Sequence, residues 1–191
     1  MSAPRPAPKP PVGLLAELTH RCPLGCPYCS NPLKLDGPRE ELDTETWKRV
    51  FAQAAALGAL HVHLTGGEPT ARRDIVELTR HAGAVGLYTN LITSGVGLPE
   101  KSYDALVEAG LDHVQLSLQG ADAATNDRFA HYDGAFARKL RVAEWVRRSG
   151  VPLTVNAVIH RGNIKQIPRF FEMAVELGAR RIEIAHTQYY G

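Results

Sequence analysis

Three cysteines, Cys22, Cys26 and Cys29, lie within one short run near the start of the chain, and the sequence contains no others. Their spacing is Cys-x3-Cys-x2-Cys. Thiolate is the soft ligand that iron–sulfur clusters require, so three thiolates this close in sequence can hold three corners of an iron–sulfur cube. The fourth iron then has no cysteine to bind it. A metal with one position unfilled by protein can coordinate an outside ligand, so the pattern predicts a reactive cluster.

Other uses of the three cysteines fit the sequence less well. A structural zinc site would need His20 as its fourth ligand, yet zinc sites usually take their ligands from two separated pairs, and His20 lies in a strained position beside Cys22. The cysteines could also be isolated buried thiols. A disulfide framework does not fit an odd, clustered set without a secretory signal. The spacing therefore favours an iron–sulfur cluster.

The composition is that of one ordinary globular domain. The chain has 191 residues, 44% of them apolar, and a net charge of +2 with basic and acidic residues intermixed. It lacks the concentrated basic charge of nucleic-acid-binding proteins, and no apolar run approaches the roughly 20 residues that cross a bilayer. We expect the proline-rich residues 1–11 to form a disordered tail before a core domain over residues 12–191. Clustered free thiols without an export signal predict a reducing cytosol.

Strand-like segments alternate with helical patterns along the rest of the chain. The predicted strands are Gly13–Leu18, His61–Leu64, Leu87–Thr93, His113–Leu118, Leu153–Val158 and Arg181–Ala185. The predicted helices are Asp43–Leu57, Asp74–His81, Pro99–Ala109, Ala135–Ser149 and a last one that contains Ile167 to Val175. Asp43 and Asn163 are candidate helix caps, and Gly178 is a candidate stop.

Strands that are separated by helices predict parallel pairing with right-handed crossovers. Two α/β architectures share this alternation, an open doubly wound sheet and a partial (β/α)6 barrel of the TIM type. Polar and glycine-rich motifs follow the carboxyl ends of several strands, as they do in barrel active sites. Doubly wound sheets bind ligands at the same edge, so the pattern alone leaves both open.

A second candidate site follows the second predicted strand, in the run Leu64-Thr65-Gly66-Gly67-Glu68-Pro69. Paired glycines let a backbone approach a ligand closely, and the adjacent carboxylate can accept hydrogen bonds from an ammonium group. By itself such a run is more typical of a turn. Its place one helix after the three cysteines indicates a shared function.

Together, the cysteine run and the Gly-Gly-Glu-Pro run resemble the radical S-adenosylmethionine (SAM) superfamily from residue 12 onward. The resemblance implies a six-strand partial barrel, a [4Fe–4S] cluster held by the three cysteines, and SAM bound to the fourth iron. Gly66, Gly67 and Glu68 would bind the methionine amino group of SAM. An external electron donor would then trigger cleavage of SAM to a 5′-deoxyadenosyl radical. Because the cofactor breaks the difficult bond, no catalytic acid or base is assigned.

The same resemblance implies further cofactor contacts. Tyr28 matches an aromatic position that lies against the adenine, Ser117 matches a serine that contacts SAM, and Gln119 and Asn156 occupy polar positions at the cofactor edge. Each has a structural alternative, since Tyr28 could shield the cluster from water and the polar side chains could satisfy strand ends or buried backbone groups. A Gly-x-Ile-x-Gly motif found in part of the superfamily is not visible in Val155–Gly162.

Several other polar residues near predicted strand ends are harder to assign. The segment Thr93-Ser94-Gly95 is a weaker candidate for a cofactor contact. His63, His160 and His186 also lie near strand ends, and we interpret each as a packed or exposed histidine instead of a catalytic acid or base.

Within the superfamily, the stretch Leu14–Pro32 is similar to the PqqA peptide cyclases, which act early in the synthesis of pyrroloquinoline quinone (PQQ). Similarity recurs at Ser117–Gly120, Asn156–His160 and Ala185–Gly191. The resemblance implies that a glutamate side chain is joined to a tyrosine ring of the precursor peptide PqqA by a carbon–carbon bond. It also implies a small peptide chaperone, PqqD, as partner.

The chain departs from that subfamily in one respect. Its members carry a C-terminal extension with further cysteines for auxiliary clusters, whereas this chain has no cysteine after Cys29. We interpret the chain as a fragment, with a shortened form as the alternative. Three functions remain open: a PqqA peptide cyclase domain, another radical SAM enzyme that modifies peptides, and a cluster-bearing domain that binds a peptide without turnover.

Overall fold

The computed structural model describes residues 9–29 and 41–187. The predicted tail over residues 1–11 lies outside this part of the chain except for its end. The segment Ala185–Gly191, noted for its similarity to the peptide cyclases, is described only as far as Thr187.

Six parallel strands form one sheet in the order in which they occur along the chain. All six predicted strands are confirmed with nearly the predicted ends. They are β1 (Gly13–Thr19), β2 (His61–Gly66), β3 (Tyr88–Thr93), β4 (His113–Leu118), β5 (Leu153–Ile159) and β6 (Arg181–His186).

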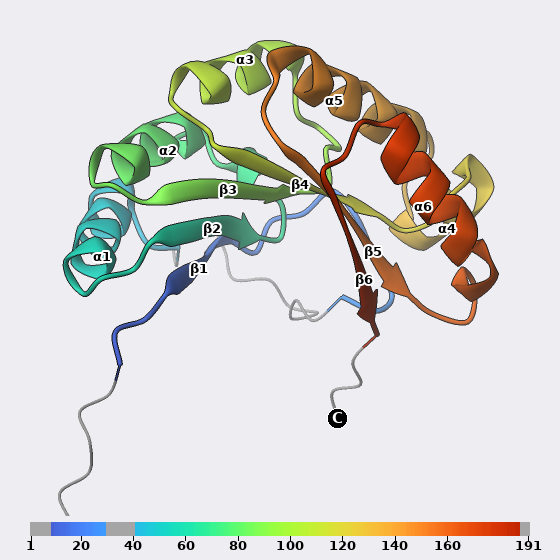
Figure 1. The fold of residues 1–191 in the computed structure, drawn as a ribbon, viewed down its shortest axis with the longest axis horizontal. Coiled ribbons are helices and arrows are strands. Elements are labelled where there is room, and N and C mark those ends of the chain that lie inside the picture. Colours follow the sequence, from blue (N-terminus) through green and yellow to red (C-terminus); the bar gives the residue numbers. More distant parts are fainter. Residues whose placement is uncertain (1–8, 30–40, 188–191) are drawn as a thin grey trace, which may run out of the picture.

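Helices follow the strands and cover one face of the sheet, the convex side of the arch in Figure 1. They are α1 (Thr44–Ala56), α2 (Ile75–Ala84), α3 (Glu100–Glu108), α4 (Ala123–Ala130), α5 (Ala135–Ser149) and α6 (Ile167–Glu176), with short 3-10 turns η1 (Pro69–Ala71) and η2 (Ile164–Gln166). A doubly wound sheet would reverse its strand order and carry helices on both faces. The sequential order with one covered face is therefore a partial (β/α)6 barrel, open between β1 and β6.

The core lies between the convex face of the sheet and the helices. Alternate strand residues point toward the helices, so a strand such as β2 buries every second side chain. The buried set includes Leu18, Val62, Leu64, Leu91, Leu116 and Val155 from the strands and Phe51, Leu78, Leu106, Val142 and Phe170 from the helices. Burying such side chains contributes about 1.5–3 kcal/mol each, which is what holds the helices to one face.

The helices agree with the sequence in most places, and the exceptions are one cap and one whole helix. The Asp43 carboxylate accepts a hydrogen bond from the Thr46 amide at 2.7 Å, as expected of the α1 cap. Asn163 was predicted to cap the last helix, and this is wrong: its side chain caps no helix and instead donates to the carbonyls of Gln119 and Val158. Helix α4 was missed because its buried residues are Thr125, Asn126 and Ala130, which form no apolar stripe.

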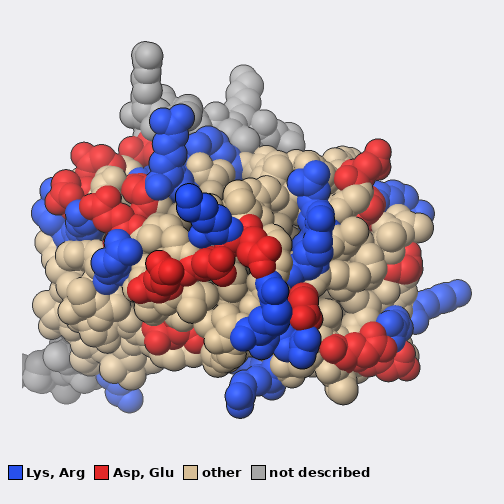
Figure 2. All heavy atoms as spheres, turned by 90° about the horizontal axis from the view of Figure 1, so that it is seen from above, with Lys and Arg blue, Asp and Glu red and all other residues tan. Residues whose placement is uncertain are grey.

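The convex surface carries charges of both signs. Figure 2, which views this side, shows lysine and arginine interleaved with aspartate and glutamate. Exposed ion pairs join residues one or two turns apart on the same helix, such as Arg147 with Glu144 on α5 and Arg169 with Glu176 on α6. Among the described residues, no helix is long and apolar enough to cross a membrane.

The concave face of the sheet is polar. At the amino-terminal ends of the strands it holds a cavity of about 490 Å³ lined by His63, Asn90, His113, Gln115 and Glu183, among others. The Asn90 side chain lies 2.8 Å from His63 Nδ1, and His113 Nε2 lies 2.8 Å from Thr154 Oγ1. Burial lowers the pKa of both histidines below the usual range, with His61 acting in the same direction on His63.

These two histidines predict how stability depends on pH. Below the ordinary histidine pKa of about 6.5 the unfolded chain binds more protons than the folded chain, so the free energy of unfolding should decrease as the pH falls from about 7 to about 5.5. Urea unfolding at several pH values measures this slope. The double variant His63→Asn/His113→Gln should flatten it, and an unchanged slope in the variant would contradict the assignment.

Candidate cluster and cofactor site

The three cysteines lie on the loop that follows β1, at the carboxyl-terminal edge of the sheet. Cys22 and Cys26 are partly buried, Cys29 is exposed, and none forms a disulfide. A backbone hydrogen bond of 3.0 Å from the Cys29 amide to the Cys26 carbonyl closes a tight turn between the last two. Cys29 lies close enough to Cys22 and Cys26 to contribute to the raised pKa of both.

The end of β2 holds this loop by direct backbone contact. The Gly67 amide donates to the Thr19 carbonyl at 2.6 Å, and the Glu68 amide donates to the Arg21 carbonyl at 2.7 Å. A Cβ atom at Gly66 would lie 2.3 Å from the Thr19 oxygen, and one at Gly67 would lie 2.5 Å from the Arg21 oxygen. The sequence predicted a close approach to a ligand. The glycines allow a close approach to the chain's own cysteine loop, and their predicted contact with a ligand stays a prediction.

The Glu68 carboxylate is buried and is satisfied by the protein itself. Its Oε1 accepts from the Thr93 hydroxyl at 2.8 Å and the Thr70 hydroxyl at 2.7 Å, and its Oε2 accepts from the Ser94 amide at 2.8 Å and the Ser94 hydroxyl at 2.6 Å. The side chain, 1% exposed, therefore joins the end of β2 to the end of β3. These bonds give Thr93 and Ser94 a structural partner in Glu68, and the weaker prediction that they contact a cofactor stays a prediction.

Helix α4 holds the other side of the cysteine loop. The Gly25 amide donates to the Ala130 carbonyl at 3.0 Å, where α4 ends. Leu24 packs against a small apolar cluster of Val96, Ala130 and Ala135. The loop is thus fixed between the ends of β2 and α4, two elements far apart in sequence.

A buried lysine lies beneath the site and was missed by the sequence analysis. Lys139, on α5, is 0% exposed, and its ammonium donates to the Ser117 carbonyl at 2.8 Å. Burial lowers the pKa of Lys139 to about 8, while the nearby Cys26 and Glu68 act in the opposite direction. The signal in the sequence is a lysine within the buried stripe Ala135, Val142, Ala143 and Val146 of an amphipathic helix.

The surroundings of Cys22 and Cys26 oppose ionisation of these two thiols in the absence of metal. Burial raises the pKa of Cys22, and it raises the pKa of Cys26 to about 11. At Cys26, the nearby Lys139 opposes this increase and the other two thiols add to it. Metal ions bind thiolates, so loading the site releases protons. A buried cation beneath the loop helps to offset the negative charge that a thiolate cluster would bring.

Four buried polar atoms close to the loop have no partner within hydrogen-bond geometry in the described part of the chain, although Tyr28 and His160 both lie close enough to Gln119 to interact with it weakly. They are Tyr28 Oη, Gln119 Oε1, Asn156 Oδ1 and His160 Nε2. The ring of Tyr28 lies 5.5 Å from that of His160, and Asn156 is the register partner of Ser117 on the neighbouring strand. Native proteins rarely leave such atoms unpaired, so their concentration here indicates a bound polar molecule. Burial raises the pKa of Tyr28, with Cys26 adding to the effect, which keeps the phenol neutral.

His160 is a packed histidine, as the sequence indicated, and it lies beside the cysteine loop. Its ring stacks on Phe129 at 3.8 Å between centroids, and its Nδ1 accepts from the Gly162 amide at 3.1 Å. Burial lowers the pKa of His160, and Arg128 lowers it further, so the ring is neutral near pH 7. With Nδ1 as acceptor, Nε2 carries the proton and is a hydrogen-bond donor, and the weak interaction of the ring with the Gln119 backbone acts against the fall in pKa. His63 hydrogen-bonds to Asn90 and His186 is exposed, in agreement with the sequence interpretation of those two.

The residues present fit a cluster with an organic cofactor better than a single ion. No group of three His, Cys, Asp or Glu side chains in residues 9–29 and 41–187 is placed to hold one metal ion. A cubane needs no such convergence, because each thiolate binds a different iron. The unpaired oxygens and the His160 donor match the ammonium, hydroxyl and adenine groups of SAM.

A comparison with family models matches the radical SAM superfamily over residues 16–174. The chain belongs to this superfamily. Its members are enzymes, and its cofactors are a [4Fe–4S] cluster and SAM. The partial barrel and the cysteine loop at its carboxyl-terminal edge agree with this membership.

Curated relatives refine the comparison. The chain is 65% identical over 181 residues to a PqqA peptide cyclase of Methylocella silvestris and 58% identical over 182 residues to one of Rhizobium meliloti, covering 95% of this chain and 48% of each relative. The chain thus spans about half the length of the curated relatives that it matches.

Solved structures share the fold. SuiB of Streptococcus suis bound to S-adenosylmethionine superposes with a TM-score of 0.85 at 23% identity, over 95% of this chain and 42% of that one. The protein anSMEcpe with bound AdoMet superposes with a TM-score of 0.74 at 19% identity, over 92% of this chain and 51% of that one.

Because Gly66 and Gly67 lie directly against the cysteine loop, one added methyl group there should lower the stability of the fold. Gly67→Ala should lower the free energy of unfolding by ~1–3 kcal/mol, because backbone must move to accept the new Cβ. Gly83→Ala is the matched control, since a Cβ at Gly83 meets nothing within 4 Å and should change stability by less than ~1 kcal/mol, in the stabilising direction. Chemical denaturation measures both, and equal effects would contradict the contact.

Proposed function

We propose that this chain is the radical SAM domain of a PqqA peptide cyclase that forms a carbon–carbon bond between a glutamate side chain and a tyrosine ring of the PqqA precursor peptide. The observation that carries the proposal is the group of unpaired buried polar atoms beside three thiols. Identity of 58–65% to PqqA peptide cyclases over 95% of the chain supports the choice of substrate.

Cys22, Cys26 and Cys29 would each bind one iron of the cluster. Gly66, Gly67 and Glu68 would meet the methionine amino group of SAM through backbone carbonyl oxygens, because the Gly67 and Glu68 amides already bond the cysteine loop and the Glu68 carboxylate is occupied. When bound, the cluster and SAM together supply a 5′-deoxyadenosyl radical that can remove a hydrogen atom from the peptide. The protein positions the cofactor and excludes water from it.

The remaining cofactor contacts would come from the ends of β4 and β5. Ser117, Gln119 and Asn156 lie at this edge, and Tyr28 faces them from the cysteine loop with its phenol neutral. Gln119 and Asn156 offer acceptor oxygens, and His160 adds a donor through Nε2.

The role of His160 can be tested separately from cluster assembly. His160→Phe keeps an aromatic ring against Phe129 and removes the Nε2 donor, so affinity for SAM should fall ~10-fold while iron content is unchanged. Equilibrium dialysis of labelled SAM against the reconstituted protein measures affinity. His186→Phe, at an exposed position on β6, is the control. Unchanged SAM affinity in His160→Phe would remove His160 from the proposed site.

The substrate and its delivery extend beyond this chain. A structure of SuiB bound to its precursor peptide SuiA shares this fold, which supports a peptide as the molecule that enters the barrel. By family resemblance, the peptide chaperone PqqD would deliver PqqA, an external donor would supply electrons, and the remaining half of the enzyme would carry auxiliary clusters. Free, clustered cysteines favour a reducing cytosol as the location.

The decisive experiment is incubation of the longer protein, which we propose contains this chain, with PqqA, PqqD, SAM and a reductant under anaerobic conditions. We expect PqqA to lose the mass of two hydrogens and 5′-deoxyadenosine to appear, and we expect Cys26→Ala to abolish both. Formation of 5′-deoxyadenosine with an unchanged PqqA would favour another peptide substrate. An intact cluster with no 5′-deoxyadenosine would favour a domain that binds a peptide without turnover.

A further inference from the structure

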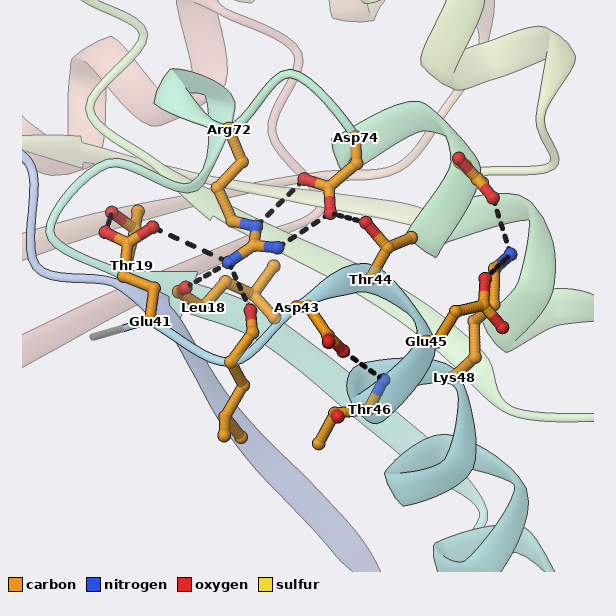
Figure 3. Close-up of polar contacts among 12 residues, drawn as sticks. Leu18, Thr19, Glu41, Asp43, Thr44, Glu45, Thr46, Lys48, Arg72 and Asp74 are labelled. Carbon is orange, nitrogen blue, oxygen red and sulfur yellow. Dashed lines mark hydrogen bonds and ion pairs between the residues drawn. The ribbon is translucent and has the colours of Figure 1, made fainter. Parts of the chain in front are cut away.

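Arg72 lies just after the Gly-Gly-Glu-Pro run, and its guanidinium is buried in a group of polar atoms (Figure 3). The side chain is 7% exposed. Its Nε and Nη2 donate to the two oxygens of Asp74 at 2.9 Å and 2.7 Å, which is the bidentate geometry of a strong arginine–carboxylate pair. A fully paired guanidinium at this depth makes no contact that the proposed chemistry uses directly.

The other terminal nitrogen of Arg72 joins two distant points of the backbone. Its Nη1 donates to the Leu18 carbonyl at 3.0 Å and to the Leu42 carbonyl at 3.0 Å. Leu18 lies at the end of β1, just before the cysteines, and Leu42 lies just before α1, on their far side. One nitrogen therefore brings together both ends of the chain segment that carries all three thiols.

Asp74 extends the same connection to the next helix. Its Oδ2 accepts from the Thr44 hydroxyl at 2.6 Å, at the first residue of α1. Burial alone would raise the pKa of Asp74, but the hydrogen bonds from Arg72 and Thr44 outweigh it and hold the pKa below the usual range. The carboxylate is therefore charged at neutral pH, as the ion pair requires.

A second pair of charges lies between Arg72 and the cysteines. Glu41 Oε2 is 3.6 Å from Arg72 Nη1, and the Glu41 carboxylate also contacts the Thr19 hydroxyl and the Arg21 guanidinium. The Arg21 amide in turn donates to the Thr19 hydroxyl at 3.1 Å. Arg21 immediately precedes Cys22, so this group of contacts ends at the residue before the first cysteine.

We propose that Arg72 is a positioning residue that closes the base of the cysteine loop and so holds the three thiols ready for the cluster. This inference rests on the proposed ligation of the cluster by Cys22, Cys26 and Cys29. Arg72 acts through the backbone at Leu18 and Leu42 and touches no reacting atom. We refer to Arg72, Asp74 and Thr44 as the loop clasp.

Two physical arguments support the loop clasp. Joining the ends of a long segment costs conformational entropy, and a buried, fully bonded arginine can offset that cost at one point. A lysine could not replace it, because a single ammonium cannot bond two carboxylate oxygens and two carbonyls that lie on different sides. The planar fork of arginine fits all four acceptors.

The test compares three arginine variants of the full chain after anaerobic reconstitution with iron and sulfide. Arg72→Met should lose its cluster to a ferrous chelator ~10-fold faster than the parent chain, as other residues that orient metal ligands do. Arg72→Lys should resemble Arg72→Met, because it keeps the charge and loses the fork. Arg73→Met is the matched control, since Arg73 is exposed next to it in sequence, and it should behave as the parent does.

Hydrogen exchange on the chain without cluster gives an independent measurement. Amides in the described part of the cysteine loop, residues 19–29, should lose protection in Arg72→Met and keep it in Arg73→Met, while the amides of β4 and β5 stay protected in both. If Arg72→Met fails to fold, Thr44→Val removes one bond of the loop clasp and should give a smaller change in the same direction.

Two results would overturn the proposal. One is parental chelation kinetics together with parental loop protection in Arg72→Met. The other is complete rescue of both by lysine, which would reduce the role of Arg72 to its charge. These results are distinguishable from a failure of the proposed function. Hydrogen exchange measures the loop clasp even in a protein that forms no crosslink or assembles no cluster.

Discussion

Two backbone hydrogen bonds, from the Gly67 and Glu68 amides to the Thr19 and Arg21 carbonyls, hold the cysteine loop against the end of β2. They form only because no Cβ is present at Gly66 or Gly67, where one would overlap the opposing oxygens. The point at which the chain leaves β1, and therefore the position of Cys22, depends on this contact. Glu68 then fixes the end of β2 to the end of β3. Helix α4 supports the cysteine loop from its other side through the Gly25 amide.

The buried polar groups around the loop fall into two kinds. One kind is fully hydrogen-bonded within the protein, and the other leaves a buried atom for a bound molecule. Glu68, Arg72 and Asn163 have their hydrogen bonds filled by the protein, so each joins elements that are distant in sequence. Tyr28, Gln119, Asn156 and His160 each leave a buried atom without a partner. Because an unpaired buried polar atom costs free energy, the first kind stabilises the site and the second kind indicates where a cofactor completes it.

The architecture explains why the chemistry gathers at one edge. Helices cover only the convex face, so the apolar side chains of the strands point outward and the concave face can be polar. Parallel strands all end at the same edge, which brings the loops after β1, β2, β4 and β5 together. The convex surface carries interleaved charges of both signs.

The sequence by itself determined the strands, most of the helices and the chemistry of the cysteine loop. Strand and helix periods are local, and the three cysteines with their spacing occupy one short run, so both could be predicted without a fold. Tertiary structure decided between a barrel and a doubly wound sheet, because the periodicity of the sequence does not determine the order of strands in the sheet. It also decided where Lys139, His160 and Arg72 lie and what they contact. Each of these residues contacts others that are far away in sequence. The register of the strands and the packing of the helices bring these partners together.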